Sequence, residues 1–318
     1  MKLVFLERKS IGMDIDISKM EDFGELTVYD DKLSEENLQR IRDAEVIIAS
    51  KSRLDEATLS SAKDLKLICD FATGYDNVDI KYCRSRGITV TNVSDYSTST
   101  VAQHTFALLL NLLEHISFYD DFVKSGKYEK HDSFSYYGNP FLELSGLTYG
   151  IAGLGNIGKR VASIAKAFGC RVIYYSTSGK NSNSEYEQVS FDKLLKESDI
   201  ISLHCPLGPK TYHMMDREAF HKMKSSAILI NVARGAVVDN EALYEALIKG
   251  EIASAGLDVV EGEPIRGDNP LTRIKDSGKL IITPHMAWGS VEARSRLLDM
   301  VYENIKAFIK GESLNVVS

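Results

Sequence analysis

The sequence has 318 residues, of which 44% are hydrophobic and 26% are charged, and its formal net charge is −7. Its length predicts two domains, each large enough for its own core, and its composition is that of an ordinary globular protein. The acidic balance argues against nucleic acid as a partner, and no apolar stretch approaches the length of a membrane span. We therefore expect neither nucleic acid nor a membrane as a partner.

The cysteines indicate the redox state of the compartment in which the protein is expected to reside. They are scattered along the chain without a C-x-x-C motif or a neighbouring histidine cluster: Cys69, Cys83, Cys170 and Cys205. Such cysteines are typical core residues of a reduced, cytoplasmic protein, and they offer no metal site. The apolar N-terminal run is too short for the hydrophobic region of a signal peptide, so it predicts a first strand instead.

Strand and helix patterns alternate through the first hundred residues. The expected strands are Lys2–Leu6, Glu25–Tyr29, Val46–Ala49, Leu67–Phe71 and Ile88–Asn92. The expected helices are Ile17–Phe23, Ser34–Arg42 with Ser34 as its N-cap, Asp55–Ser61, and Ile80–Arg86 with Gly87 as its stop. This alternation predicts a parallel, right-handed, doubly wound sheet.

The longest helical pattern runs from Ser97 to about Lys124, and Ser99 or Thr100 stands where a cap would lie. Because it precedes a second β-α series, it is a candidate hinge between two domains. Aromatic residues then dominate Tyr128–Phe141, which predicts an irregular arm and a candidate subunit contact.

The second series has six expected strands and ends in a long helix. The strands are Tyr149–Gly153, Arg171–Tyr175, Ile200–His204, Ala227–Asn231, Ser254–Asp258 and Leu280–Thr283. The polar stretch Ser176–Ser184 predicts a surface loop. The last helix, Val291–Lys310, is placed to return the chain to the first domain.

A glycine fingerprint follows the first of these strands. Gly153, Gly155 and Gly158 have the G-x-G-x-x-G spacing between an apolar strand and a helical pattern. In this context the first glycine permits a tight turn, the second lets the backbone approach a pyrophosphate, and the third lets helix and strand pack closely. The N–H groups at the start of the helix then face the anion. The alternative is a strand–helix turn with chance glycines.

Three later strands are followed by side chains that suit a dehydrogenase of 2-oxo acids, at the sheet edge where ligands bind. The guanidinium of Arg234 suits a carboxylate and its adjacent carbonyl, and the imidazole of His285 suits proton transfer. A carboxylate, from Asp258 or Glu263, suits holding that imidazole in its charged form. Singly, each has a plainer explanation as a surface ion pair, a structural histidine or a solvated turn. Their joint appearance behind the fingerprint favours a site.

Together these motifs resemble the D-isomer-specific 2-hydroxyacid dehydrogenases, from about Val46 to the C-terminus. The matching segments are Gly153–Gly158, Asn231–Gly235 with Val238 and Asp239, Gly256–Pro264, and Thr283–His285. The resemblance implies an α/β fold of two doubly wound parallel-sheet domains separated by a cleft. A flavodoxin-like substrate domain would comprise residues 1–98 and 290–318, and a Rossmann coenzyme domain would comprise residues 99–289.

The resemblance also implies roles for single residues. Arg234 would clamp the substrate, His285 would be the general acid/base and Glu263 its partner, while Asp258 would contact the nicotinamide carboxamide. A homodimer is expected on the same ground. The implied cofactor-binding residues are Gly153, Gly155, Asn156, Ile157, Gly158, Ser176, Pro206, Val232, Ala233 and Asp258.

Three segments resemble the glycerate dehydrogenase/hydroxypyruvate reductase branch of the family: Phe71–Asp79, Ser99–His104 and His285–Trp288. This implies that the backbone N–H groups of Thr73 and Gly74 bind the substrate carboxylate, the alternative being a plain turn. Trp288 would either wall the substrate pocket or pack at the hinge. Lys51 and Arg53 follow a strand, and they either reach the cleft or are solvated surface charges.

One position departs from the NAD-binding pattern. An acidic residue after the second Rossmann strand usually bonds the ribose, and its place, about 18 residues beyond Gly158, is taken by Ser176. With hydroxyls and Lys180 nearby and no arginine directly following, the sequence permits NADP without requiring it. We therefore expect NAD(P)H as cofactor.

The leading hypothesis is an oxidoreductase that converts hydroxypyruvate or glyoxylate to D-glycerate or glycolate. Another 2-hydroxy acid is the first alternative, such as D-lactate, a longer acid or 3-phosphoglycerate. A phosphorylated substrate needs additional cations, for which only Lys51 and Arg53 are candidates. The second alternative is a non-catalytic protein that senses NAD(H).

Overall fold

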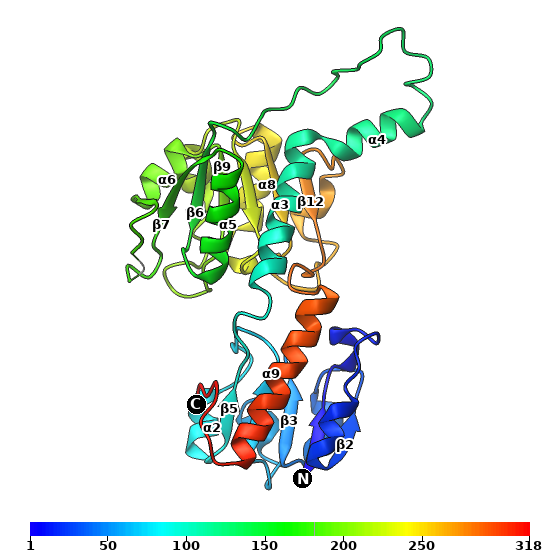
Figure 1. Ribbon diagram of the computed structural model, residues 1–318, viewed down its shortest axis with the longest axis vertical. Helices are drawn as coiled ribbons and strands as arrows, with labels where there is room; N and C mark the ends of the chain where they lie inside the picture. The colour runs from blue at the N-terminus through cyan, green and yellow to red at the C-terminus, as the bar shows by residue number, and fades with distance from the viewer. Residues whose placement is uncertain (181) are drawn as a thin grey trace. The chain divides into compact units, whose positions relative to one another are not determined.

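A computed structural model describes residues 1–180 and 182–318, so Asn181 of the expected loop Ser176–Ser184 lies outside the described residues. The chain divides into two compact units. Unit 1 comprises Met1–Ser97 and Gly289–Ser318, and unit 2 comprises Thr98–Trp288. Each unit is built on a sheet whose strands are all parallel. Figure 1 shows how the helices and strands are arranged within each unit.

The sheet of unit 1 has five strands in the order β2-β1-β3-β4-β5. These are β1 Lys2–Phe5, β2 Glu25–Val28, β3 Val46–Ala49, β4 Leu67–Asp70 and β5 Thr89–Thr91. The described helices are the 3₁₀ turns η1 Arg8–Ile11, η2 Ser18–Phe23 and η3 Glu35–Ile41, and α1 Glu56–Leu59, α2 Ile80–Ser85 and α9 Val291–Ile309. The last of these packs against β4, so the C-terminal part of the chain completes the unit that the N-terminal part begins.

The sheet of unit 2 has seven strands in the order β12-β11-β10-β9-β6-β7-β8. Its strands are β6 Thr148–Ala152, β7 Arg171–Tyr175, β8 Glu187–Gln188, β9 Ile200–Leu203, β10 Ile228–Asn231, β11 Ser254–Leu257 and β12 Leu280–Ile282. Its helices are α3 Thr98–Glu114, α4 Ile116–Lys124, α5 Asn156–Ala167, α6 Phe191–Glu197, α7 Arg217–Lys222, α8 Asn240–Lys249 and the 3₁₀ turns η4 Gly235–Val237 and η5 Pro270–Arg273. The chain order reverses between β6 and β9, which is the position where open α/β sheets bind ligands.

Successive residues of these strands bury their side chains on opposite faces. Ile228 and Ile230 pack with α3 and α5, whereas Leu229 packs with α6, α7 and α8 on the other face. Burial on both faces explains why the strands are nearly continuous apolar runs. The predicted fold class, two doubly wound parallel sheets, is confirmed.

The long helix expected from Ser97 to Lys124 is wrong as one element. His115 has a φ of 53°, and it separates α3 from α4. Eight residues of α3 are buried, whereas α4 has none, so α4 lies away from the core. Ser99 and Thr100 lie inside the first turn of α3 and do not cap it, because the helix begins at Thr98. The helices expected near residues 18–23 and 35–41 are 3₁₀ turns, the second interrupted at a non-helical residue.

The segment after α4 carries the predicted aromatic arm. Residues 131–143 contain no helix or strand and run outward from unit 2 (Figure 1). Phe122 stacks on Tyr136 with ring centroids 4.0 Å apart, whereas Phe134 is 94% exposed. The arm therefore holds a small aromatic cluster of its own and presents an additional apolar side chain to solvent.

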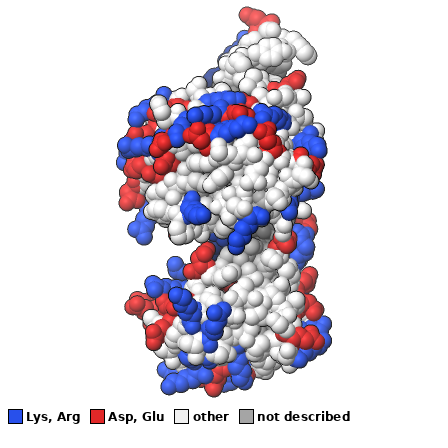
Figure 2. Space-filling view, turned by 90° about the vertical axis from the view of Figure 1, so that its left-hand side faces the viewer, with Lys and Arg blue, Asp and Glu red and all other residues white. Residues whose placement is uncertain are grey.

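The described surface carries both signs of charge. Figure 2 shows Lys and Arg interspersed with Asp and Glu over one face. Among the described residues, no helix is long and apolar enough to cross a membrane, and no three metal-ligating side chains gather into a cluster. The four cysteines are free and buried, and burial raises the pKa of Cys69 to about 12.

Candidate active site

The turn between β6 and α5 brings three glycines together. Gly153 has a φ of +97°, and a Cβ there would lie 2.8 Å from the carbonyl oxygen of His204 on the loop after β9. At Gly158 a Cβ would overlap the carbonyl oxygen of Gly153. Packing within the protein therefore requires glycine at both positions.

Gly155 is different, because a Cβ there would meet no described atom within 4 Å. It is the N-cap of α5, its side-chain position faces open space, and the first free N–H groups of a twelve-residue helix follow it at Asn156 and Ile157. A helix N-terminus that a small residue leaves open suits the pyrophosphate of a dinucleotide. The residues present thus fit a nicotinamide dinucleotide.

Other residues implied for the cofactor follow neighbouring strands. Pro206 lies beyond β9 and is exposed, and Val232 and Ala233 lie buried directly after β10. Asn231, buried at the end of β10, accepts a hydrogen bond from the Ala233 N–H (3.0 Å) and donates one to the Arg234 carbonyl (3.0 Å). Asn231 therefore shapes the turn that leads to Arg234, a positioning role that the sequence reasoning did not assign.

Ser176 directly follows β7, and it departs from the predicted surface loop. Ser176 is buried, and its Oγ has no hydrogen-bond partner among the described residues. Burial follows from its place beside the glycine turn, where the Gly153 N–H donates to the Tyr175 carbonyl (3.0 Å). Ser178 and Lys180 beyond it are exposed as predicted.

The carboxylate of Asp258, directly after β11, organises the loop that follows β12. It is 1% exposed and accepts from the Thr283 hydroxyl (2.6 Å) and from the N–H groups of Met286 (2.9 Å) and Ala287 (2.8 Å). The Asp258 carbonyl accepts from the His285 N–H (2.8 Å). His285 has a φ of 54°, a left-handed conformation that the surrounding bonds hold in place.

His285 and Glu263 meet side chain to side chain. The Nδ1 of His285 donates to one oxygen of Glu263 (2.6 Å), and the other oxygen accepts from the Val260 N–H (3.0 Å). Both side chains are partly exposed, 26% and 34%. The carboxylate fixes the tautomer of the ring, so Nε2 is the nitrogen that can exchange a proton with a ligand.

Arg234 lies at the end of the neighbouring strand β10. Its Nη1 donates to the Ala233 carbonyl (2.8 Å), and its side chain is half-buried. A Cβ on Gly235 would overlap the backbone at Val260, so only glycine lets this turn touch the loop that carries Glu263. The Asn240 amide ties the same two loops by donating to the Glu261 carbonyl (3.2 Å).

His104 on α3 joins this network, although its role was not predicted from the sequence. Its Nε2 lies 2.9 Å from the Thr283 hydroxyl oxygen and 3.5 Å from an oxygen of Asp258. Because the single Thr283 hydrogen goes to Asp258, the His104 Nε2–H is the donor to Thr283. A histidine at this spacing on a helix has no sequence signal that distinguishes it from a structural one.

The remaining predicted residues fall into both units. Trp288 is half-buried against the apolar cluster of α3 and α5, and its indole N–H donates to the His285 carbonyl (3.0 Å). Thr73 and Gly74 follow β4 in unit 1. Also in unit 1, Lys51 is exposed, and Arg53 is 84% exposed and paired with Asp55 at 2.5 Å.

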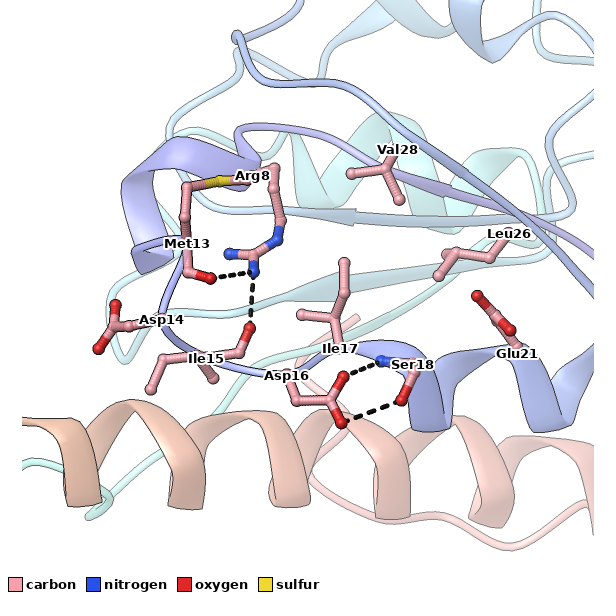
Figure 3. Close-up of a pocket in the computed structure, with 10 residues that line it drawn as sticks. All are labelled: Arg8, Met13, Asp14, Ile15, Asp16, Ile17, Ser18, Glu21, Leu26 and Val28. Carbon is pink, nitrogen blue, oxygen red and sulfur yellow. Dashed lines mark hydrogen bonds between the residues drawn. The ribbon is translucent and has the colours of Figure 1, made fainter.

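A separate groove of about 380 Å³ lies in unit 1 (Figure 3) and contains none of the predicted site residues. It is lined by Arg8, Met13, Asp14, Ile15, Asp16, Ile17, Ser18, Glu21, Leu26 and Val28. The Arg8 guanidinium donates to the carbonyls of Gly12, Met13 and Ile15, so its hydrogen bonds hold the wall of the groove itself.

Comparison with known proteins agrees with this geometry. Residues 106–287 match the NAD binding domain of the D-isomer specific 2-hydroxyacid dehydrogenases. A hydroxypyruvate reductase of Blautia hydrogenotrophica is 37% identical over the whole of both chains, and a glyoxylate reductase of Korarchaeum cryptofilum is 39% identical over 93% of this chain and 90% of that one. The crystal structure of a D-lactate dehydrogenase from Aquifex aeolicus, complexed with NAD and lactic acid, has a TM-score of 0.86 at 32% identity, covering 98% of this chain and 96% of that one.

The chain therefore belongs to the family of D-isomer-specific 2-hydroxyacid dehydrogenases. It is an oxidoreductase of the kind that transfers hydride between a nicotinamide cofactor and a 2-oxo or 2-hydroxy acid. The predicted family is confirmed.

Proposed function

We propose that this protein reduces hydroxypyruvate and glyoxylate to D-glycerate and glycolate. The observation that carries the proposal is the contact of His285 with Glu263, at 2.6 Å, on loops that also border Arg234. The names of the two relatives, a hydroxypyruvate reductase and a glyoxylate reductase, support this choice of substrates.

Each residue of this cluster has a proposed task. A nicotinamide cofactor, when bound, supplies the hydride to the carbonyl carbon. His285 gives its Nε2 proton to the carbonyl oxygen, and Glu263 stabilises the imidazolium before that transfer. Arg234 pairs with the substrate carboxylate and orients the carbonyl. The N–H groups of Thr73 and Gly74 bind the same carboxylate.

The cofactor site is proposed to comprise the glycine turn, the start of α5, Ser176, and the residues that follow β9, β10 and β11. These are Gly153, Gly155, Asn156, Ile157, Gly158, Ser176, Pro206, Val232, Ala233 and Asp258. The unpartnered, buried hydroxyl of Ser176 supports use of both NADH and NADPH, because it suits a ribose hydroxyl without repelling a 2′-phosphate. For Asp258, the three donors already bound to its carboxylate add a second task, which is to hold the His285 loop.

Unit 1 is proposed as the substrate domain and unit 2 as the coenzyme domain, with boundaries near residues 98 and 289. The exposed aromatic arm supports a homodimer. The four free cysteines support a cytoplasmic location. The similarity to a D-lactate dehydrogenase structure favours pyruvate as the second candidate substrate.

Initial rates with hydroxypyruvate, glyoxylate and pyruvate, each with NADH and with NADPH, test the proposal. The expected result is a larger kcat/KM for hydroxypyruvate or glyoxylate than for pyruvate, and a loss of at least about 1,000-fold in kcat for His285→Ala. His221→Ala, at an exposed position of helix α7, is the matched control. A fully active His285→Ala variant would contradict the mechanism, and higher kcat/KM for pyruvate would favour a lactate dehydrogenase.

A further inference from the structure

Two carbonyl groups of the loop after β4 accept hydrogen bonds from the segment that follows β5. The Val93 N–H donates to the Ala72 carbonyl (3.1 Å), and the Asn92 side-chain amide donates to the Thr73 carbonyl (2.8 Å). Both bonds lie within unit 1.

These two bonds determine where the proposed carboxylate donors point. A trans peptide is planar, and its carbonyl and N–H point in opposite directions. The Ala72 carbonyl shares a peptide plane with the Thr73 N–H, and the Thr73 carbonyl shares one with the Gly74 N–H. Fixing both carbonyls on residues 92 and 93 therefore turns both N–H groups away from that segment.

Asn92 is itself held by the C-terminal part of the chain. Its backbone N–H donates to the Asn315 carbonyl (3.2 Å), and its carbonyl accepts from the Asn304 side chain on α9 (3.0 Å). The Asn315 side chain donates to the Asn304 side-chain oxygen (2.8 Å), and Asn304 is 1% exposed. Asn315 has a φ of 53°, which asparagine tolerates better than most residues.

The C-terminal tail, residues 315–318, is also paired with β5. Val316 bridges to Thr91 in antiparallel fashion, and the Val317 N–H donates to the Val90 carbonyl (2.9 Å). A side-chain bond from the Val90 N–H to the Ser318 hydroxyl (3.0 Å) extends this pairing to the last residue. Residues 315–318 thus pair with β5, the strand that Asn92 directly follows.

We propose that Asn92 is a positioning residue for substrate binding, and that Asn304 and Asn315 hold it from the C-terminal end of the chain. The inference rests on the proposed function, in which Thr73 and Gly74 bind the substrate carboxylate. It adds a requirement: the C-terminal tail sets affinity for the 2-oxo acid although it contributes no group to the reaction.

The test compares the steady-state kinetics of three variants with those of wild type, each at saturating cofactor. Asn92→Leu removes the amide donor at similar size, and Asn315→Gly keeps the left-handed backbone but removes the bond to Asn304. Val316→Ala is the control, because it shortens a tail side chain without touching the asparagines. We expect KM for the 2-oxo acid to rise about 10-fold or more in Asn92→Leu and about 3-fold in Asn315→Gly, with kcat and the cofactor KM within about 2-fold of wild type and Val316→Ala unchanged.

Oxalate affinity, measured by calorimetry on the same cofactor-saturated proteins, separates this inference from the proposed function. Oxalate presents a carboxylate and is not reduced. If the wild type reduces no 2-oxo acid but oxalate binds more weakly to Asn92→Leu than to wild type, the proposed function fails and the inference stands. If oxalate binds equally to both variants and to wild type, or if the cofactor affinity falls in parallel, the inference is overturned.

Discussion

Two buried aspartates occupy similar places in the two units and differ in how they are satisfied. Asp70 ends β4 of unit 1 and Asp258 directly follows β11 of unit 2, and each is 1% exposed. Asp258 accepts three hydrogen bonds of 2.6–2.9 Å, whereas neither oxygen of Asp70 has a hydrogen-bond partner among the described residues. Burial, with a further contribution from the Glu7 carboxylate, raises the pKa of Asp70 to about 8.

The difference shows that hydrogen-bond donors around a buried carboxyl, and not its position at a strand end, decide how that carboxyl is stabilised. Around the Asp258 carboxylate, two backbone N–H groups and a hydroxyl take the place of water. Burial of the Asp70 carboxyl favours its protonated form. The first organises the loop that carries His285, the proposed proton donor, and the second costs stability as the pH rises.

Removing the charge of Asp258 is expected to have the largest effect. In Asp258→Asn the amide nitrogen must face N–H donors, so the Thr283–Ala287 loop loses part of its anchor. We expect kcat/KM to fall by at least about 1,000-fold and the free energy of unfolding by about 3 kcal/mol. Urea unfolding and initial rates measure the two effects. A variant with wild-type rates would show that the loop does not depend on this carboxylate.

Removing the charge of Asp70 is expected to stabilise the protein in a pH-dependent way. Because the pKa in the folded state is raised above the ordinary value of 3.8, the carboxyl contributes no penalty below about pH 4. Between about pH 4 and 8 the unfolded chain loses this proton and the folded chain keeps it, so the free energy of unfolding falls by about 1.4 kcal/mol per pH unit from this group.

Asp70→Asn is therefore expected to exceed wild type in stability by several kcal/mol more at pH 8 than at pH 4. Urea unfolding at both pH values measures this difference, and Asp64→Asn, at an exposed turn position between α1 and β4, is the control. An equal difference at both pH values would contradict a raised pKa for Asp70.

Placing a third aspartate beside a strand end extends the comparison to Ser176, which directly follows β7. In Ser176→Asp the new carboxylate has a partner only when a ribose hydroxyl is bound. We expect the ratio of kcat/KM for NADH over NADPH to rise about 10- to 100-fold, because the carboxylate repels a 2′-phosphate. Ser176→Ala should change the ratio by less than about 5-fold. A ratio that stays constant in Ser176→Asp would remove Ser176 from the cofactor site.

Removing the His104 donor to Thr283, which itself donates to Asp258, is expected to have the smallest effect. His104→Ala leaves the Thr283 hydroxyl without its donor but keeps the two N–H donors to Asp258. We expect kcat/KM to fall about 10-fold, and His104→Gln to recover part of it because an amide can donate to Thr283. His115→Ala, at the break between α3 and α4, is the control for loss of a histidine on the same segment. Equal rates for His104→Ala and wild type would assign His104 to packing alone.

Much of the fold followed from local pattern. The described strands match the predicted ones to within one residue at either end, except for β8, whose two residues are too few to show a period. The break at His115 was missed, because α3 and α4 are both amphipathic and only packing against the sheet distinguishes them. The family motifs indicated Arg234, Glu263 and His285. The resemblance of Ser99–His104 assigned no role to His104, and the sequence carried no signal for the Asn92–Asn304–Asn315 network.

The sequence by itself determined the two β-α series, the glycine turn and the chemical types gathered after the strands, because these depend on period, propensity and spacing along the chain. Only the tertiary structure decided which carboxylates are satisfied, and which residues 25 to more than 200 positions apart hold one another. Such contacts depend on the order of strands in a sheet and on the return of α9 to unit 1. Local sequence cannot encode them separately, since each bond forms only when distant segments meet.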